Sequence, residues 1–178
     1  MHEIGFELYT QLLDKAVRAY RRGEVPNLED NTDNCDVDLG IAALIPDDYL
    51  PDISARLVLY KRINAAEDQA ALHHLQVEMV NRFGLLPPAC KNLFAIMQLK
   101  QTAFGLGIHK IEASATHIKL HFLAKTSVEP MKLIKLIQQH PKIYKLDGPN
   151  KLKWTGNISD ASERITAVDA LLTQLSTP

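Results

Sequence analysis

The sequence of 178 residues is poor in cysteine and aromatic residues and contains no long apolar run. Two cysteines, Cys35 and Cys90, cannot build the disulfide framework of a small secreted domain, and neither has a cysteine or histidine at metal-binding spacing. Residues 1–20 lack the apolar core of a signal peptide, and no segment approaches the roughly 18 apolar residues of a membrane span. These absences predict a reduced, cytoplasmic protein without a membrane partner.

An excess of one charge sign is also lacking, because 20 Lys and Arg residues stand against 21 Asp and Glu, a net charge of -1. Dedicated nucleic-acid-binding domains usually show a basic excess, so the overall charge gives no such signature. A composition of 46% hydrophobic and 23% charged residues is ordinary for a globular protein and excludes a disordered tail or a collagen-like chain. The length predicts one domain, or one domain with an appendage.

Catalytic motifs are missing as well. A phosphate-binding loop needs closely spaced glycines before a helix, whereas Gly105 and Gly107 follow a predicted helix and suit its C-terminal cap. The best candidates for an acid–base pair are Asp47 and Asp48, but adjacent carboxylates between prolines are typical of a turn. We therefore predict a non-catalytic chain without a cofactor, and no metal site.

Histidines provide the remaining candidates for metal ligands. His73 and His74 are neighbours on a predicted helix, where successive side chains point about 100° apart and do not easily share one metal ion. His117 and His121 share one face of a predicted strand, opposite its apolar residues. Because no cysteine or carboxylate lies near them in sequence, we expect both to be solvated.

The apolar patterns predict an α+β fold in which a three-helix segment is followed by a β-hairpin–helix–β-hairpin unit and a C-terminal helix. An amphipathic helix over residues 1–23 is tethered to this fold by residues 24–35, which are rich in Asp, Asn and Glu. The predicted order after this linker is strand 37–41, helices 53–65, 67–82 and 87–104, strands 108–113 and 118–122, a helix from Pro130, strands 143–146 and 151–154, and a helix from Asp160.

One helix end combines the residue types that are enriched at protein interfaces. Glu78, Asn81, Arg82 and Phe83 lie directly before Gly84, and arginine and aromatic side chains often dominate binding energy. The simpler interpretation is that Phe83 packs in the core and Glu78 pairs with Arg82 across one helical turn. Physical arguments alone leave both interpretations open.

Lysines near the C-terminus form a second candidate surface. The residues of this strip that we consider for nucleic-acid contact are Lys132, Lys135, Lys145, Lys151 and Lys153. Tyr144 and Trp154 lie between them and provide candidate stacking platforms. However, Lys151 and Lys153 alternate with apolar residues as in a half-buried strand, so the two aromatic residues are equally compatible with a core position.

Several segments, in the same order, resemble the end of the motor and the C-terminal domain of the bacterial transcription-repair coupling factor (Mfd) family. The segments are Glu3–Tyr9, Ile45–Tyr49, Arg56–Leu57 with Tyr60–Ile63, Asn81–Pro87 and Leu146–Pro149. The resemblance implies that 1–23 is the terminal helix of a RecG-like translocase motor. It further implies that 24–35 is a linker and 36–178 is the C-terminal regulatory domain.

The resemblance also implies a function for the longer protein. Members of this family use ATP hydrolysis to translocate on double-stranded DNA, displace stalled RNA polymerase and recruit UvrA. Their C-terminal domain packs on a UvrB-like N-terminal module of the same chain and masks the UvrA-binding surface. The contact stretch of the family falls on Glu78, Asn81, Arg82 and Phe83, with Asn81 where an acidic residue is often found. The expected function is therefore autoinhibition, and the alternative is an accessory nucleic-acid-contacting domain that uses the lysine strip.

Overall fold

The structure, a computed structural model, describes residues 35–176. The predicted helix 1–23 and the linker up to residue 34 lie outside the described residues. The described chain separates into two compact units, one formed by residues 42–98 and the other by residues 35–41 and 99–176. No helix within this described range is long and apolar enough to cross a bilayer.

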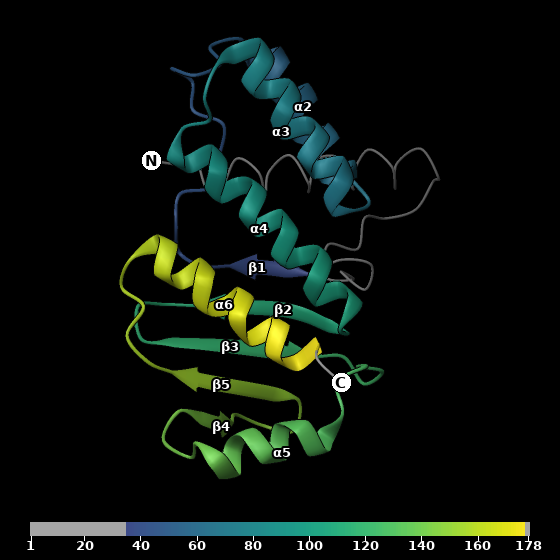
Figure 1. The fold of residues 1–178 in the computed structure, drawn as a ribbon, viewed down its shortest axis with the longest axis vertical. Coiled ribbons are helices and arrows are strands. Elements are labelled where there is room, and N and C mark those ends of the chain that lie inside the picture. The colour runs from purple at the N-terminus through teal and green to yellow at the C-terminus, as the bar shows by residue number, and fades with distance from the viewer. Residues whose placement is uncertain (1–34, 177–178) are drawn as a thin grey trace, which may run out of the picture. The chain divides into compact units, whose positions relative to one another are not determined.

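Helices and strands follow one another in the predicted order (Figure 1). The described elements are β1 (Asp36–Asp38), α2 (Ile53–Ala65), α3 (Gln69–Phe83), α4 (Pro88–Gly105), β2 (Ile108–Ala113), β3 (His117–Phe122), α5 (Pro130–Gln139), β4 (Tyr144–Leu146), β5 (Lys151–Thr155) and α6 (Ala161–Ser176). The predicted α+β class is confirmed, with both β-hairpins flanking α5 as expected.

The helices of the first unit begin at side chains that satisfy their free amide groups. Asp52 accepts a hydrogen bond from the backbone N–H of Ser54 (3.0 Å), and Asp68 accepts one from that of Ala71 (2.7 Å). Such N-terminal caps stabilise a helix by about 1 kcal/mol each. Because capping depends on residues within one helical turn, the approximate starts of both helices could be predicted from the sequence.

A buried hydroxyl group attaches the segment before α2 to the core of the first unit. The phenol oxygen of Tyr60, on α2, accepts a hydrogen bond from the backbone N–H of Ile45 (2.7 Å). Tyr60 is 3% exposed, and the apolar side chains of α2, α3 and the start of α4 surround the same core. The main members of this core are Leu59, Ile63, Leu72, Leu75, Met79, Cys90, Leu93 and Phe94.

A five-stranded sheet in the order β1-β2-β3-β5-β4 forms the second unit (Figure 1). β1 pairs with β2 in parallel, and the other pairs are antiparallel. The prediction of a strand over 37–41 is wrong in its bounds, because β1 ends at Asp38. Gly40 turns the chain with a φ of +64°, a conformation that favours glycine, and its N–H donates to Asp38 Oδ1 (3.1 Å).

The two faces of the sheet differ in chemistry. Ile111, Leu120 and Leu152 are adjacent on one face and fully buried, and α6 crosses the sheet in Figure 1. Charged and polar residues occupy the opposite face, as strand alternation requires. A register shift between Ile108 and Lys110 marks a β-bulge in β2, which leaves an extra residue opposite β3.

This bulge explains why the expected solvation of His121 is wrong. The extra residue, His109, places its ring 5.8 Å from the ring of His121, edge to face, so that His121 is only 9% exposed. Burial lowers the pKa of His121 below its ordinary value of 6.5, and nearby Lys151 adds to the shift while Glu112 opposes it. The imidazole of His121 is therefore neutral at pH 7.

Candidate partner-binding surface

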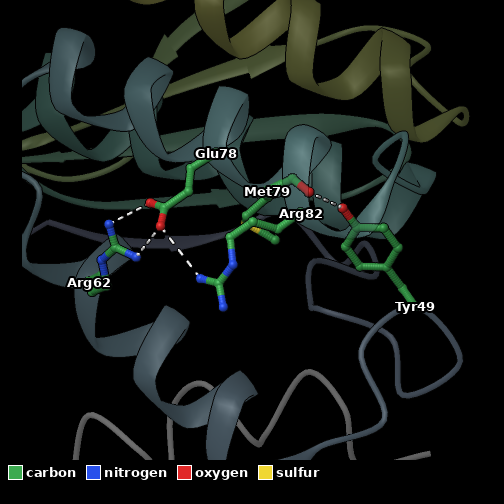
Figure 2. Close-up of polar contacts among 5 residues, drawn as sticks. All are labelled: Tyr49, Arg62, Glu78, Met79 and Arg82. Atoms are coloured by element: carbon green, nitrogen blue, oxygen red, sulfur yellow. Dashed lines mark hydrogen bonds and ion pairs between the residues drawn. The ribbon is translucent and has the colours of Figure 1, made fainter.

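The C-terminal half of α3 carries an ion-pair cluster that joins it to α2. Glu78 accepts hydrogen bonds from both terminal nitrogens of Arg62, at 3.0 Å and 2.6 Å, and its Oε1 lies 3.5 Å from Nη1 of Arg82 (Figure 2). The hydrogen bond from Arg62 is the main cause that lowers the pKa of Glu78, and the same bond raises the pKa of Arg62. One carboxylate thus holds two guanidinium groups together on an exposed surface.

Two aromatic rings contact each other at the C-terminal end of α3, beside this cluster. The rings of Phe83 and Tyr49 meet edge to face at 6.1 Å, and the guanidinium carbon of Arg82 lies 4.8 Å from the centre of the Phe83 ring. Phe83 is half-buried, so one part of its ring remains available. Arginine over an aromatic ring is a favourable cation–π arrangement that holds both side chains in place.

Tyr49 positions this helix end through its hydroxyl group. It donates to the carbonyl oxygen of Gly84 (2.8 Å) and lies 3.2 Å from that of Met79, the contact drawn in Figure 2. Gly84 has a φ of +97° and ends α3 with a hydrogen bond from its N–H to Val80 O (3.0 Å). Sequence reasoning missed this role of Tyr49, because the residues that it joins lie about 30 positions further along the chain.

A groove of about 290 Å³ lies between the start of α2 and the end of α3. Its lining comes from both helices and consists of Asp52, Ser54, Ala55, Val58, Leu59, Arg62, Arg82 and Phe83. Val58 is 56% exposed although it is apolar, and Arg62 and Arg82 of the same lining are also exposed. A small, mostly apolar depression with arginine and phenylalanine in its lining has the residue types that are enriched at binding hot spots.

Three of the four residues predicted for the partner-binding surface therefore lie in one cluster. Glu78 and Arg82 pair as predicted for one helical turn, and Phe83 is only partly used in packing. Asn81 lies beside them on the exposed side of α3. Arg62 belongs to the same cluster and was not predicted, because its contact with Glu78 is made between two helices.

The structure divides the predicted lysine strip. The Nζ atom of Lys132 donates to the carbonyl oxygen of Leu175, at the end of α6, and Lys135 is exposed on α5. Lys145, Lys151 and Lys153 instead lie on the polar face of the sheet. The five lysines thus do not form one continuous surface.

The two aromatic residues of the strip lie on the opposite face of the sheet from Lys145, Lys151 and Lys153. Tyr144 and Trp154 are paired across β4 and β5, and Trp154 is also paired with buried Ile118 on the apolar face. Tyr144 is buried and its hydroxyl donates to Gln174 Oε1 (3.3 Å). Tyr144 is a core residue and Trp154 is a half-buried residue of the apolar face, so neither forms a stacking platform beside the lysines of the sheet.

The other residues considered for chemistry lie apart from one another. Asp47 and Asp48 are exposed in a turn that is closed by the hydrogen bond from the N–H of Leu50 to Pro46 O (3.1 Å). His73 and His74 are exposed on α3. Among residues 35–176, no group of three histidine, cysteine or acidic side chains could hold a metal ion.

Both cysteines are buried, and burial raises the pKa of Cys35 to about 12 and that of Cys90 to about 11. Their thiols are therefore protonated at neutral pH, which leaves them poor nucleophiles and poor metal ligands.

The sequence of this chain is similar to those of known proteins. A family model described as the TRCF domain matches residues 39–133. The transcription-repair-coupling factor of Haemophilus influenzae is 45% identical over 173 residues, and that of Escherichia coli is 41% identical over 176 residues. These matches cover 97% and 98% of the present chain but 15% of each relative.

A crystal structure of the C-terminal domain of a transcription-repair coupling factor has the same fold. It aligns with a TM-score of 0.67 and 21% identity, and the alignment covers 80% of this chain and 91% of that chain. The described α+β fold is therefore that of a TRCF domain. The chain belongs to the transcription-repair coupling factor (Mfd) family and spans about 15% of the length of the relatives that it matches.

Proposed function

We propose that this domain is a non-catalytic, autoinhibitory module of a longer transcription-repair coupling factor. In this proposal it packs through the groove between α2 and α3 on the UvrB-like N-terminal module of the same protein, and it masks the surface that binds UvrA. ATP hydrolysis, translocation on double-stranded DNA and displacement of stalled RNA polymerase belong to other domains of the longer chain. Family membership supports this assignment.

One observation carries the proposal. Glu78 binds Arg62 and Arg82, and these two arginines line an apolar groove together with the half-buried ring of Phe83. Because two hydrogen bonds to Glu78 hold Arg62, and Arg82 contacts both Glu78 and the ring of Phe83, part of the side-chain entropy is already lost before a partner covers them. The surface is thus organised for binding before a partner arrives.

The proposed contact is reversible because most of its charged groups remain in contact with solvent. Exposed ion pairs contribute little to affinity and are screened by salt. A masking domain that belongs to the same chain does not need high intrinsic affinity, since the connecting chain keeps it at a high effective concentration near the UvrB-like module. Engagement of polymerase or DNA by the motor would then shift the population toward the open, UvrA-binding state.

In this proposal, Asn81 influences how tightly the domain binds the UvrB-like module. Its side chain is exposed beside Arg82 and is neutral, whereas the family often has an acidic residue at this position. Hydrogen bonds to an ionised group are roughly twice as strong as those between neutral groups. We therefore expect Asn81→Asp to tighten the contact with the UvrB-like module.

The test is a calorimetric titration of this chain with the isolated UvrB-like module, followed by UvrA binding to the full-length protein. The combined substitution of Phe83→Ala and Arg82→Glu should weaken the titrated contact by about tenfold or more and increase UvrA binding, because it removes the aromatic anchor and reverses one charge.

The matched control combines Val77→Ala and Lys91→Glu. It changes the net charge by the same amount as the test variant, at exposed positions outside the groove. This control should leave both measurements unchanged. Unaltered UvrA binding by the full-length protein with the Phe83 and Arg82 substitutions would contradict the proposed masking.

A further inference from the structure

The polar face of the sheet carries a row of lysines, in which strand pairing joins Lys119 to three lysines of the predicted strip. Lys119 of β3 is directly opposite Lys153 of β5, and Lys153 is directly opposite Lys145 of β4. Neighbouring strands are about 4.8 Å apart, so the side chains of these three lysines leave the same face of the sheet at adjacent positions. In the next row, Lys151 is opposite His121. We call Lys119, Lys145, Lys151 and Lys153 the lysine row.

This arrangement is unfavourable for the sheet by itself. Like charges directly opposite one another on paired strands are destabilising. Lys119 has a partial compensation, because its Nζ lies 3.3 Å from Asp147 Oδ2. Lys145, Lys151 and Lys153 have no carboxylate of residues 35–176 within ion-pair distance. On β2, Glu112 is directly opposite Lys119 and is also bound by Lys110 at 2.9 Å.

The charge on this face is separated by sign. Asp36 and Asp38, both exposed, occupy the β1 end, and the lysine row occupies the β3-β5-β4 end. The lysine side chains remain accessible: Lys145 is exposed, and Lys151 and Lys153 are partly exposed. A positive field therefore persists at one end of the sheet although the whole chain has a net charge of -1.

The chemistry of the lysine row selects among anionic partners. A protein partner usually requires aromatic or arginine anchors, and single-stranded nucleic acid requires rings on which bases stack. The Phe, Tyr and Trp residues of these strands, Phe122, Tyr144 and Trp154, lie on the opposite face. A duplex backbone requires only positive charges at suitable spacing, because its bases are already stacked.

We infer that the lysine row is a contact site for the phosphate backbone of duplex nucleic acid. Three or four ammonium groups, presented by three adjacent strands, replace counterions along the backbone without reading its sequence. This site lies in the sheet unit, uses none of the residues of the α2–α3 groove, and goes beyond the proposed masking. Failure of one proposal would leave the other standing, since their test variants are different.

The test measures fluorescence anisotropy of a short labelled DNA duplex titrated with this chain at several salt concentrations. Three to four phosphate contacts predict a slope of log K against log salt of about -3, which is roughly a 60-fold loss of affinity between about 50 and 200 mM salt. The combined substitution of Lys145→Gln, Lys151→Gln and Lys153→Gln should weaken binding by about tenfold or more and reduce the slope to about -1.

The matched control combines Lys91→Gln, Lys125→Gln and Lys135→Gln, which removes the same charge from exposed lysines outside the row. It should bind the duplex within about twofold of the unchanged chain. Thermal unfolding of the lysine-row variant checks its integrity, and we expect its melting temperature to be unchanged or higher because repulsion is relieved.

Three outcomes would overturn the inference. They are the absence of saturable binding at low salt, equal weakening by the control, and competition by a polyglutamate peptide or single-stranded DNA as strong as that by the duplex. The last result would assign the lysine row to an acidic protein segment or to single strands.

Discussion

Arg164 is the residue whose replacement tests the described packing of the sheet unit most directly. It is buried on α6, and its guanidinium donates to the carbonyl oxygens of Leu39 (2.7 Å), Ile158 (3.2 Å) and Ser159 (3.4 Å). It joins three segments of one unit: the chain after β1, the loop before α6, and α6 itself. Arg164→Met removes these donors while it keeps an unbranched apolar stem.

The magnitude follows from the number of hydrogen bonds lost. A hydrogen bond from a charged group contributes about 1.5–3 kcal/mol, and two of the three have favourable lengths. Relief from burying a charge and partial rehydration of the carbonyl groups offset part of this loss. We expect the free energy of unfolding to fall by about 2–4 kcal/mol, which lowers the melting temperature by roughly 5–15 °C.

Urea unfolding followed by tryptophan fluorescence measures this change. Trp154 is the only tryptophan of the chain and lies in β5 of the same unit, so its emission reports the unfolding of this unit. Lys135→Met is the control, because it removes one positive charge from an exposed position of the same unit. A loss below about 1 kcal/mol for Arg164→Met, or an equal loss for the control, would refute this account of the packing.

Three further changes have defined outcomes. A Cβ atom at Gly156 would lie 2.3 Å from the ring of Trp154, so Gly156→Ala should destabilise the chain by about 1–3 kcal/mol in urea unfolding, whereas Gly105→Ala meets no atom and should be neutral or stabilising. Burial lowers the pKa of His121, so as the pH falls the imidazole is protonated in the unfolded chain before it is protonated in the folded chain. The free energy of unfolding should therefore fall as the pH decreases below about 6.5, and it should fall less in His121→Gln. Asp68→Ala removes the cap of α3 and should cost about 1 kcal/mol in thermal unfolding followed by circular dichroism; an unchanged melting temperature would contradict the capping role.

The helices and the hairpins were predictable because their signals are local. Asp52 and Asp68 cap helices through bonds to residues two or three positions further on. The turn at Gly148, with a φ of +104°, similarly joins two strands that are close in sequence. β1 was less predictable, because its pairing partner, β2, lies about 70 residues away and Gly40 ends it early.

The candidate site was predictable only in part. Glu78, Arg82 and Phe83 lie within two helical turns, so that their grouping follows from helical geometry. Arg62 and Tyr49 join them from other segments, and these contacts depend on how α2 and the preceding turn pack against α3. No periodicity within α3 predicts either contact.

The sequence alone determined the α+β order of elements, the family to which the chain belongs and the grouping at the end of α3. The elements and the grouping depend on residue types within a few positions of one another, where backbone geometry sets the neighbours, and the family shows in the order of short segments along the chain. The tertiary structure decided that Lys119 joins Lys153 and Lys145 in one row, that Trp154 faces the core, and that His121 is buried. These relations depend on strand order, strand register and one β-bulge, because a shift of a single residue moves every side chain of a strand to the other face.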